Sequence, residues 1–313
     1  MDTQATSLVK LKDTVSALKD ADQPLVVIAG ATATGKSALA LDLADHMPST
    51  IINADSMQVY DAIPILTAQP TAQERAQAPH ALYGFLPPDD ACSAARWSAL
   101  ALQAIQSAWD DRRLPILVGG TGLYLRSLLR GIADIPDIDP AIRTSVRAQL
   151  EADGPAPLYE QLAALDPDGA AGLSPNDRQR IARALEVVLA TGTPLAEWQK
   201  QAAPGLLDQP GVTALRVVAE MDRETLYARC ERRLDAMLSA GALDELAELM
   251  RKDLASDTPI LRAVGVPPLA QYMREALSFE EAVELAKRDT RRFAKRQLTW
   301  FRHQFADWTR LSQ

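Results

Sequence analysis

The segment GATATGKS at residues 30–37 constrains the fold of this chain more than any other part of its sequence. It matches the pattern G-x-x-x-x-G-K-[ST], follows the apolar run PLVVIAG and precedes the helical run ALALDLADHM. In the order strand, glycine-rich turn and helix, successive backbone N–H groups can surround phosphate oxygens at the N-terminus of the helix. The segment therefore predicts a phosphate-binding loop in an α/β fold; the alternative is a plain glycine turn.

Further apolar runs predict more strands of the same sheet. They are STIINADS at 49–56, RLPILVGGTG at 113–122 and ALRVVAEMD at 214–222, and helical stretches separate them. Strands that alternate with helices indicate an α/β fold with a mostly parallel sheet. Residues 131–211 show no strand pattern and predict a helical insertion domain. We therefore expect a P-loop NTPase-like core in two parts, 22–130 and 212–313, with the insertion between them.

The composition limits the class of protein. Of the 313 residues, 33 are Lys or Arg and 41 are Asp or Glu, so a net charge of −8 excludes a protein that is basic overall. Contact with nucleic acid would then require a local basic surface. The two cysteines, Cys92 and Cys230, cannot form a disulfide framework and fit a reducing compartment. No stretch approaches the roughly 20 apolar residues of a membrane span, so we expect a cytoplasmic protein without a membrane partner.

Every residue of the glycine-rich segment is a candidate for binding phosphate groups: Gly30, Ala31, Thr32, Ala33, Thr34, Gly35, Lys36 and Ser37. Lys36 would supply a positive charge, and the Ser37 hydroxyl would reach a Mg²⁺ ion. Hydrolases and motors usually end another apolar strand in an acid that organises Mg²⁺, whereas PILVGGTG ends in glycines. The nearest acid at a strand end is Asp55, which suits a site that faces an acceptor substrate; alternatively, it caps the following turn.

Several segments together resemble the tRNA dimethylallyltransferases, also called tRNA isopentenyltransferases. They are the 30–37 loop, NADSMQVY at 53–60, VGGTGLYL at 118–125, NDRQRIARALEVVLATGTPL at 176–195 and RDTRRFAKRQLTWFR at 288–302, in the order and spacing of the family. The chain departs from the family pattern in four places. LTAQP at 66–70 replaces a usual GTAKP, and Arg178 replaces a frequent Pro. Ala31 stands where the family usually has Pro, and RAVGVPP at 262–268 replaces R-x-x-G-Y-R, with the loss of an aromatic and a basic residue.

The resemblance implies the transfer of a prenyl group to RNA. The family moves a dimethylallyl group from dimethylallyl diphosphate to the exocyclic N6 amine of the adenosine on the 3′ side of the anticodon, in tRNAs that read codons beginning with U. Diphosphate is released, and Lys36 with a Mg²⁺ cofactor near Ser37 would stabilise it as it leaves. In the family, the aspartate that matches Asp55 deprotonates the amine, and the threonine that matches Thr121 positions the diphosphate or the reacting centre. Arg143 falls near an arginine that members use close to the site.

The implied partners are dimethylallyl diphosphate and the anticodon stem-loop of tRNA, and we expect the protein to act as a monomer. The tRNA contacts are predicted at Asp55, Ser56, Met57, Gln58, Gln179, Arg180, Ile181, Ala182, Arg183, Arg291, Arg292, Lys295 and Arg296. The last four belong to the run 287–302, the local basic surface that the composition requires. The alternative for these charges is a solvated helix face, with Arg183 paired to Glu186.

Two other functions remain open from the residues alone. One is a small-molecule or nucleotide kinase of the same fold, and the other is an RNA-binding protein with a vestigial phosphate loop. The basic run disfavours the kinase, because a small acceptor needs no extended cationic surface. The intact Gly35, Lys36 and Ser37, together with Asp55, disfavour a protein that only binds RNA.

Overall fold

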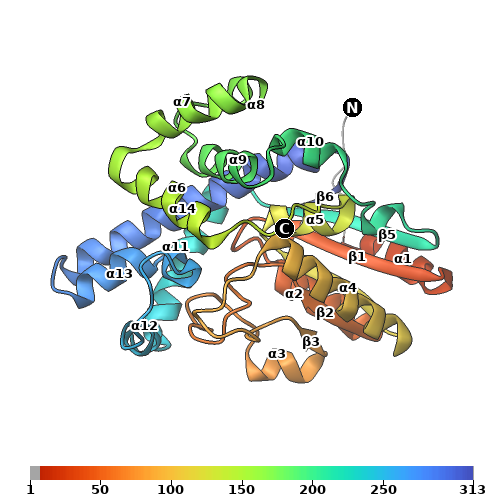
Figure 1. Cartoon of the computed structure of the whole chain (residues 1–313). Coiled ribbons are helices and arrows are strands. Elements are labelled where there is room, and N and C mark those ends of the chain that lie inside the picture. Colours follow the sequence, from red (N-terminus) through yellow and green to blue (C-terminus); the bar gives the residue numbers. More distant parts are fainter. Residues whose placement is uncertain (1–7, 313) are drawn as a thin grey trace. The chain divides into compact units, whose positions relative to one another are not determined.

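The computed structural model describes residues 8–312 and divides the chain into two compact units (Figure 1). The core unit comprises Met1–Leu129 and Leu206–Gln313, and the insertion unit comprises Arg130–Gly205. The sequence suggested 211 as the end of the insertion. The structure instead groups the short 3₁₀ helix η2 (Leu206–Asp208) with the core unit, because Leu206 is buried in its hydrophobic core.

One parallel sheet forms the centre of the core unit. Its strands are β1 (Gln23–Gly30), β2 (Ser49–Asn53), β3 (His80–Ala81), β4 (Leu114–Gly119), β5 (Val212–Glu220) and β6 (Thr309–Ser312). They lie in the order β3-β2-β4-β1-β5-β6, and every neighbouring pair is parallel. The predicted α/β fold is therefore confirmed. The sequence missed the two edge strands, since two and four residues are too few to show a periodic pattern.

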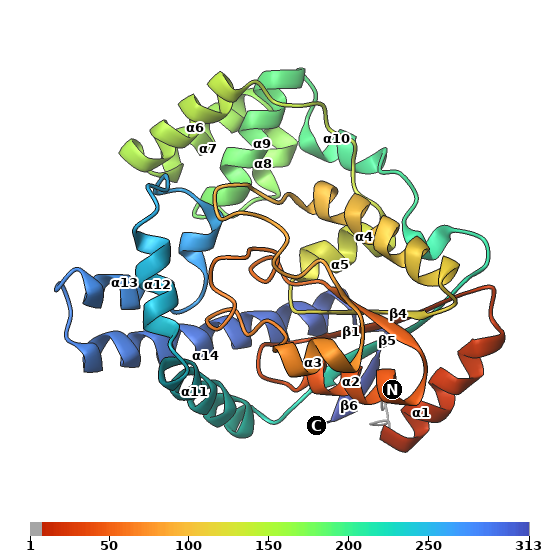
Figure 2. The ribbon, with the colours of Figure 1, turned by 90° about the horizontal axis from the view of Figure 1, so that it is seen from below.

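Both faces of this sheet are covered by helices, which explains why its strands read as continuous apolar runs. Leu25, Val27 and Ala29 of β1 pack in one hydrophobic cluster with α4, α5 and α14, whereas Val26 and Ile28 pack in another with α1 and α2. These helices are α1 (Leu8–Ala17), α2 (Lys36–His46), α4 (Ala94–Asp110), α5 (Gly122–Arg130) and α14 (Phe279–Gln304). Figure 2 shows α1, α2 and α3 (Ala72–Gln77) on the side of the sheet away from α4 and α5.

After β5 the core unit continues almost entirely as helices. They are α11 (Arg223–Ser239), α12 (Ala242–Met250), η3 (Pro259–Arg262), α13 (Val266–Met273) and α14. Helix α14 is the longest, with 26 residues, and a capping box of Ser278 and Glu281 satisfies the N–H groups at its start. It packs against both α11 and α13 and passes the end of β1 (Figure 1). Two segments from the C-terminal third of the chain, α11 and α14, therefore lie beside the loop that follows β1.

The insertion unit is helical and has a hydrophobic core of its own. Its helices are α6 (Pro140–Asp153), α7 (Pro155–Leu165), α8 (Pro167–Ala171), α9 (Arg178–Thr191) and α10 (Leu195–Lys200). The first three begin with proline, which lacks the N–H that the first turn of a helix leaves unpaired. Leu158, Leu162 and Leu185 are fully buried between these helices. Glu186 is also buried there, and it pairs with Arg147 and Arg183 at 3.6 Å each.

Candidate active site

The loop between β1 and α2, residues 30–37, has the backbone geometry of an anion-binding turn. Gly30, Ala33 and Gly35 adopt positive φ angles of 153°, 64° and 89°. A Cβ on Gly30 would come within 2.7 Å of the Ala219 oxygen on β5, so only glycine fits at the end of this strand. Such alternations of backbone conformation turn successive N–H groups toward one side of a loop. The turn leads directly into α2, whose N-terminus adds a positive potential.

Lys36 is the first residue of α2, and its side chain folds back over the loop. Its Nζ atom donates a hydrogen bond of 2.6 Å to the carbonyl oxygen of Ala31. Burial lowers the pKa of Lys36 to about 8; the Asp55 carboxylate opposes this shift and the Arg233 guanidinium adds to it. The ammonium group is therefore held at a partly desolvated place without a full counter-charge. An anionic ligand would supply that charge.

A cavity of about 530 Å³ opens over this loop, entirely within the core unit. The loop contributes Thr32, Ala33, Gly35, Lys36 and Ser37, β4 and its exit contribute Val118, Gly119 and Gly120, and the remaining lining residues are Ala38, Asp55, Gln58, Thr67, Ala68, Arg229, Arg232 and Arg233. Four cations thus face the cavity against one carboxylate. The excess of positive charge suits a ligand with several negative charges.

The three arginines on α11 were missed by the sequence analysis. Arg229, Arg232 and Arg233 fall at helical spacing on α11, which follows directly after β5. Arg233 donates a hydrogen bond to the Thr32 hydroxyl, and burial lowers the pKa of its guanidinium. The sequence feature that could have indicated them is a helix with several arginines directly after the strand that returns to the sheet. It does not reveal which loop the arginines meet, because that loop lies about 200 residues earlier.

Asp55 follows β2 at the carboxyl edge of the sheet, and its segment is held in a tight turn. One carboxylate oxygen, Oδ1, accepts the backbone N–H of Met57 at 2.9 Å, and the Asp55 N–H donates to Asn53 Oδ1 at 2.8 Å. Asp55 therefore caps the turn, as the alternative interpretation expected, and it also lines the cavity together with Lys36. The turn fixes the direction of the carboxylate, so the two interpretations do not conflict.

Thr121 lies beside this turn. The Ser56 backbone N–H donates to Thr121 Oγ1 at 2.9 Å, and Thr121 Oγ1 donates to the Ser56 hydroxyl at 3.2 Å. Among the described residues of the β4 exit, Gly119 and Gly120 line the cavity and Thr121 does not. In this structure Thr121 therefore joins the β4 exit to the segment that carries Asp55.

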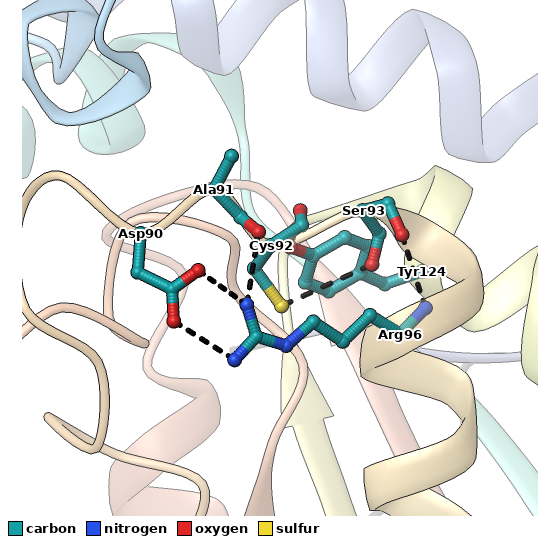
Figure 3. A network of polar contacts seen from close by, with 6 residues as sticks. All are labelled: Asp90, Ala91, Cys92, Ser93, Arg96 and Tyr124. Atoms are coloured by element: carbon teal, nitrogen blue, oxygen red, sulfur yellow. Dashed lines mark hydrogen bonds and ion pairs between the residues drawn. The ribbon is translucent and has the colours of Figure 1, made fainter. Parts of the chain in front are cut away.

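A second network of polar contacts lies at the segment that leads into α4 (Figure 3). Arg96 donates to both carboxylate oxygens of Asp90, at 2.5 and 2.9 Å, and this pair holds the segment that leads into α4. Tyr124 donates to the Cys92 oxygen at 3.0 Å and stacks on Trp97 with ring centroids 4.6 Å apart. Trp97 Nε1 in turn donates to the carbonyl oxygen of Asn53 at 3.0 Å, two residues before Asp55. The buried Trp97 ring thus joins α4 to the last residue of β2, close to the turn that carries Asp55.

A smaller cavity of about 210 Å³ adjoins the first one. The two share Thr32, Asp55, Thr67 and Arg233 in their linings. The rest of the smaller cavity is lined largely by apolar and sulfur-containing side chains and by two further arginines: Ser56, Met57, Leu66, Cys230, Leu234, Met237, Arg262, Ala263, Val264, Thr290, Phe293 and Arg296. A cationic cavity and a more apolar one therefore meet at Asp55.

Gln297 of α14 connects the two loops that form the floor of the larger cavity, and the sequence analysis did not single it out. Its Oε1 accepts the backbone N–H of Thr32 at 2.8 Å, and its Nε2 donates to the Gly120 oxygen at 2.9 Å. A Cβ on Gly120 would come within 2.3 Å of this amide. The residue lies within the basic run 287–302, whose charges concealed the role of an uncharged neighbour.

The predicted tRNA contacts on α14 fall into two groups. Arg291 forms an ion pair with Glu231 of α11, so its charge is already matched within the core unit. Arg292, Lys295 and Arg296 are exposed and share one face of the helix, and Arg292 lies 3.9 Å from the partly exposed Asp289 carboxylate. The guanidinium carbon of Arg296 lies 5.6 Å from the centroid of the Phe293 ring.

The remaining predicted residues belong to the insertion unit, whereas the residues that line both cavities belong to the core unit. Arg143 is exposed on α6, and Gln179 and Arg180 are exposed at the start of α9. Ile181 and Ala182 are buried in the core of the insertion unit. Their side chains therefore pack inside the unit and do not present a contact surface. Arg183 pairs with the buried Glu186, as the alternative interpretation expected.

Two absences apply to residues 8–312. None of the helices there is both long and apolar enough to cross a membrane. No group of three or more His, Cys, Asp or Glu side chains in that range could hold a metal ion.

Comparison with known proteins follows the same segments. Residues 58–304 match the family model described as IPP transferase, and residues 23–81 match that of isopentenyl transferase. A relative from Rhodospirillum centenum, named tRNA dimethylallyltransferase, is 50% identical over 288 residues, which cover 91% of this chain and 90% of the relative. Another of that name, from Azorhizobium caulinodans, is 49% identical over 296 residues, or 94% of each chain.

Solved structures give the same result. A full-length tRNA isopentenylpyrophosphate transferase from Bacillus halodurans is 34% identical, with a TM-score of 0.64 over 93% of this chain and 90% of that one. A eukaryotic dimethylallyltransferase, described as acting on tRNA, has a TM-score of 0.79 and 28% identity over 93% of this chain and 74% of that one. The similarity thus extends over both units.

Proposed function

This chain belongs to the IPP transferase family, and we propose that it transfers a dimethylallyl group from dimethylallyl diphosphate to the exocyclic N6 amine of the adenosine 3′ to the anticodon of tRNA. The observation that carries the proposal is the meeting of a cationic cavity with a more apolar one at the Asp55 carboxylate. The relatives named above support transfer to tRNA and give no support to the kinase alternative.

The cationic cavity is the proposed site of the donor diphosphate. The N–H groups of the 30–37 loop that are not bound to Gln297 or Ala31 would bind the phosphate oxygens, with Lys36, Arg229, Arg232 and Arg233 around them. As the bond between the allylic carbon and its oxygen breaks, negative charge grows on the leaving diphosphate and positive charge on the allyl group. Fixed cations in a partly desolvated cavity stabilise the leaving group without having to reorganise.

The reaction then needs a base at the place where the two cavities meet. The lone pair of the adenosine amine forms the new carbon–nitrogen bond, the carbon–oxygen bond to the diphosphate breaks, and the amine loses a proton. We assign that proton to Asp55, whose second carboxylate oxygen, Oδ2, is not used in the turn with Met57. The apolar side chains of the smaller cavity, such as Met57 and Leu66, suit the five-carbon group.

A Mg²⁺ ion fits the donor set on this proposal. Mg²⁺ is commonly held by one or two protein oxygens together with substrate phosphates and water, and the Ser37 hydroxyl lines the larger cavity, where it would hold such an ion. The ion would neutralise part of the diphosphate charge.

The acceptor is proposed to be held by its phosphate backbone. The exposed cations of α14 are suited to contact with RNA, in a chain that is otherwise acidic. Arg143, Gln179 and Arg180 of the insertion unit are proposed to assist. The target adenosine must leave its stack to bring its amine to Asp55, as with other enzymes that modify bases. We further propose that the protein works as a cytoplasmic monomer.

One assay tests the activity directly. Labelled dimethylallyl diphosphate is incubated with the protein, Mg²⁺ and unmodified tRNA, beside a parallel reaction with labelled ATP and candidate small acceptors. Label should pass from the prenyl donor to tRNA and not from ATP. Nuclease digestion of the product should locate the label on the adenosine next to the anticodon. If label passed from ATP to a small acceptor and not from the prenyl donor to tRNA, the protein would be a kinase and the proposed function would be wrong.

A further inference from the structure

One short loop forms a wall of both cavities. Residues 63–69, here called the wall loop, lie between β2 and α3. Thr67 and Ala68 line the larger cavity, and Leu66 and Thr67 line the smaller one. A shift of this loop would therefore change the place where the two cavities meet, next to Asp55.

Most polar groups of the wall loop are satisfied by nearby residues. The Thr67 N–H donates to the Ile63 oxygen at 3.0 Å. The Gln58 side chain donates to the carbonyl oxygens of Thr67 and Ala68, both at 2.8 Å. Ala68 has a φ of 55°, a conformation that a residue with a side chain adopts only when its surroundings hold it there.

The N–H groups of Ile65 and Leu66 are bound from a distant part of the chain. Glu245 of α12 accepts the Ile65 N–H at 2.8 Å with Oε1 and at 3.0 Å with Oε2, and it accepts the Leu66 N–H at 3.2 Å with Oε2. Hydrogen bonds from backbone N–H groups to a carboxylate are stronger than those between neutral groups. Burial raises the pKa of Glu245, and the two loop N–H groups oppose that shift.

Helix α12 contributes no residue to either cavity, and the hydrogen bonds of the Glu245 carboxylate reach the site through the wall loop. The neighbours Leu246 and Leu249 are buried and already fasten α12 to the core unit. A carboxylate at position 245 is thus not needed to pack the helix. Its contacts are directed to the wall loop.

We propose that Glu245 is a positioning residue for prenyl transfer, which holds the wall loop in the shape that brings the donor carbon and the acceptor amine together at Asp55. The inference rests on the proposed function. On this proposal the wall loop orients the reactants, whereas the 30–37 loop and the surrounding cations stabilise the charge of the diphosphate. A small displacement of the wall loop should lower the rate of transfer, because the reacting atoms must meet at near-contact distance.

Three variants test the proposal: Glu245→Ala, Glu245→Gln and the matched control Glu248→Ala. Glu248 lies on the same helix, is exposed, and pairs only with Arg251, at 2.7 Å, among the contacts that the structure describes for it. The readout is the single-turnover rate constant, measured with enzyme in saturating excess over labelled tRNA and with saturating donor, so that it does not depend on the fraction of folded enzyme. We expect Glu245→Ala to lower it about tenfold or more. Glu245→Gln, whose amide oxygen still accepts from the loop, should recover most of the rate.

Hydrogen exchange of the wall-loop amides provides an independent readout. Exchange of Leu66 should accelerate in Glu245→Ala and remain unchanged in Glu248→Ala. An unchanged rate constant in a Glu245→Ala variant that has only lost thermal stability would overturn the proposal and leave Glu245 a structural residue. If the unsubstituted protein transfers no prenyl group, the proposed function fails instead, and hydrogen exchange still decides whether Glu245 anchors the loop.

Discussion

At Lys36, burial has moved the pKa of the ammonium group close to neutral pH, so the group is mostly charged at pH 7 and partly neutral near pH 8. Its pKa of about 8 lies below the ordinary value of 10.5, because desolvation disfavours the charged form. A diphosphate would favour that form and draw the pKa upward. Protein and donor together should therefore take up a proton when they bind near pH 8, and donor affinity should fall as the pH rises above this value.

Calorimetry in two buffers of different ionisation enthalpy measures this uptake. Dimethylallyl diphosphate suits the experiment, because the last ionisation of a phosphate ester lies near pH 6. We expect uptake of a fraction of a proton at pH 8 and none with Lys36→Met. Equal uptake by the variant would assign the proton to another group.

Loss of the Lys36 side chain should affect catalysis more than tRNA binding. Lys36→Ala removes a cation that is most needed as the diphosphate leaves. We expect turnover to fall by about two orders of magnitude or more, with little change in tRNA affinity measured by filter binding. A parallel loss of tRNA affinity would show that the loop contacts RNA or supports the fold.

The Asp55 turn makes Asp55→Asn an unusually clean test of the base. Asparagine keeps an Oδ1 atom, so the hydrogen bond from the Met57 N–H can persist while the charge is lost. We expect tRNA and donor binding to stay within a few-fold, and single-turnover transfer to fall by about 10²–10⁴, the usual contribution of a positioned general base. Near-normal transfer by this variant would reduce Asp55 to a residue that caps its turn.

At the scale of single elements, the pairing of charges on α14 refines what the sequence predicts. The basic run looked uniform, yet Arg291 pairs with Glu231 while Arg292, Lys295 and Arg296 share an exposed face. Changing these three to Ala should weaken tRNA binding and reduce the log–log salt slope by roughly two, since each phosphate contact contributes about 0.7 to 0.9. Arg291→Ala is the matched control and should leave the slope nearly unchanged. If the triple variant and the unsubstituted protein had equal salt slopes, these three side chains would face solvent and would not contact tRNA.

Local patterns explain which elements could be predicted from the sequence. The glycine-rich loop, β1 and β4 were predictable, because burial on both faces makes a strand a continuous apolar run. The contacts that complete the site were not. Arg233 and Gln297 reach Thr32 across 201 and 265 residues of sequence, and Glu245 reaches Ile65 across 180. Nothing in the composition of α11, α12 or α14 specifies which loop each helix meets.

At the scale of the whole molecule, the chain interrupts its core unit with an insertion that has a separate hydrophobic core. This division predicts that the insertion unit can be destabilised alone. Leu162 is fully buried in its core, and Leu162→Ala should lower the free energy of unfolding of that unit by about 2–5 kcal/mol, through lost apolar contacts and the cavity left behind.

Hydrogen exchange of α7 and α9 compared with β1 and β4 measures whether the effect stays within the insertion unit. We expect faster exchange in the two helices, unchanged exchange in the two strands and unchanged binding of dimethylallyl diphosphate, because every residue that lines the larger cavity belongs to the core unit. Transfer to tRNA should decline, since Arg143, Gln179 and Arg180 lie in the weakened unit. Leu39→Ala, on α2 of the core unit, is the converse control and should accelerate exchange in β1. If Leu162→Ala accelerated exchange in β1 and β4 as much as in α7 and α9, the two units would unfold as one, and the insertion would have no stability of its own.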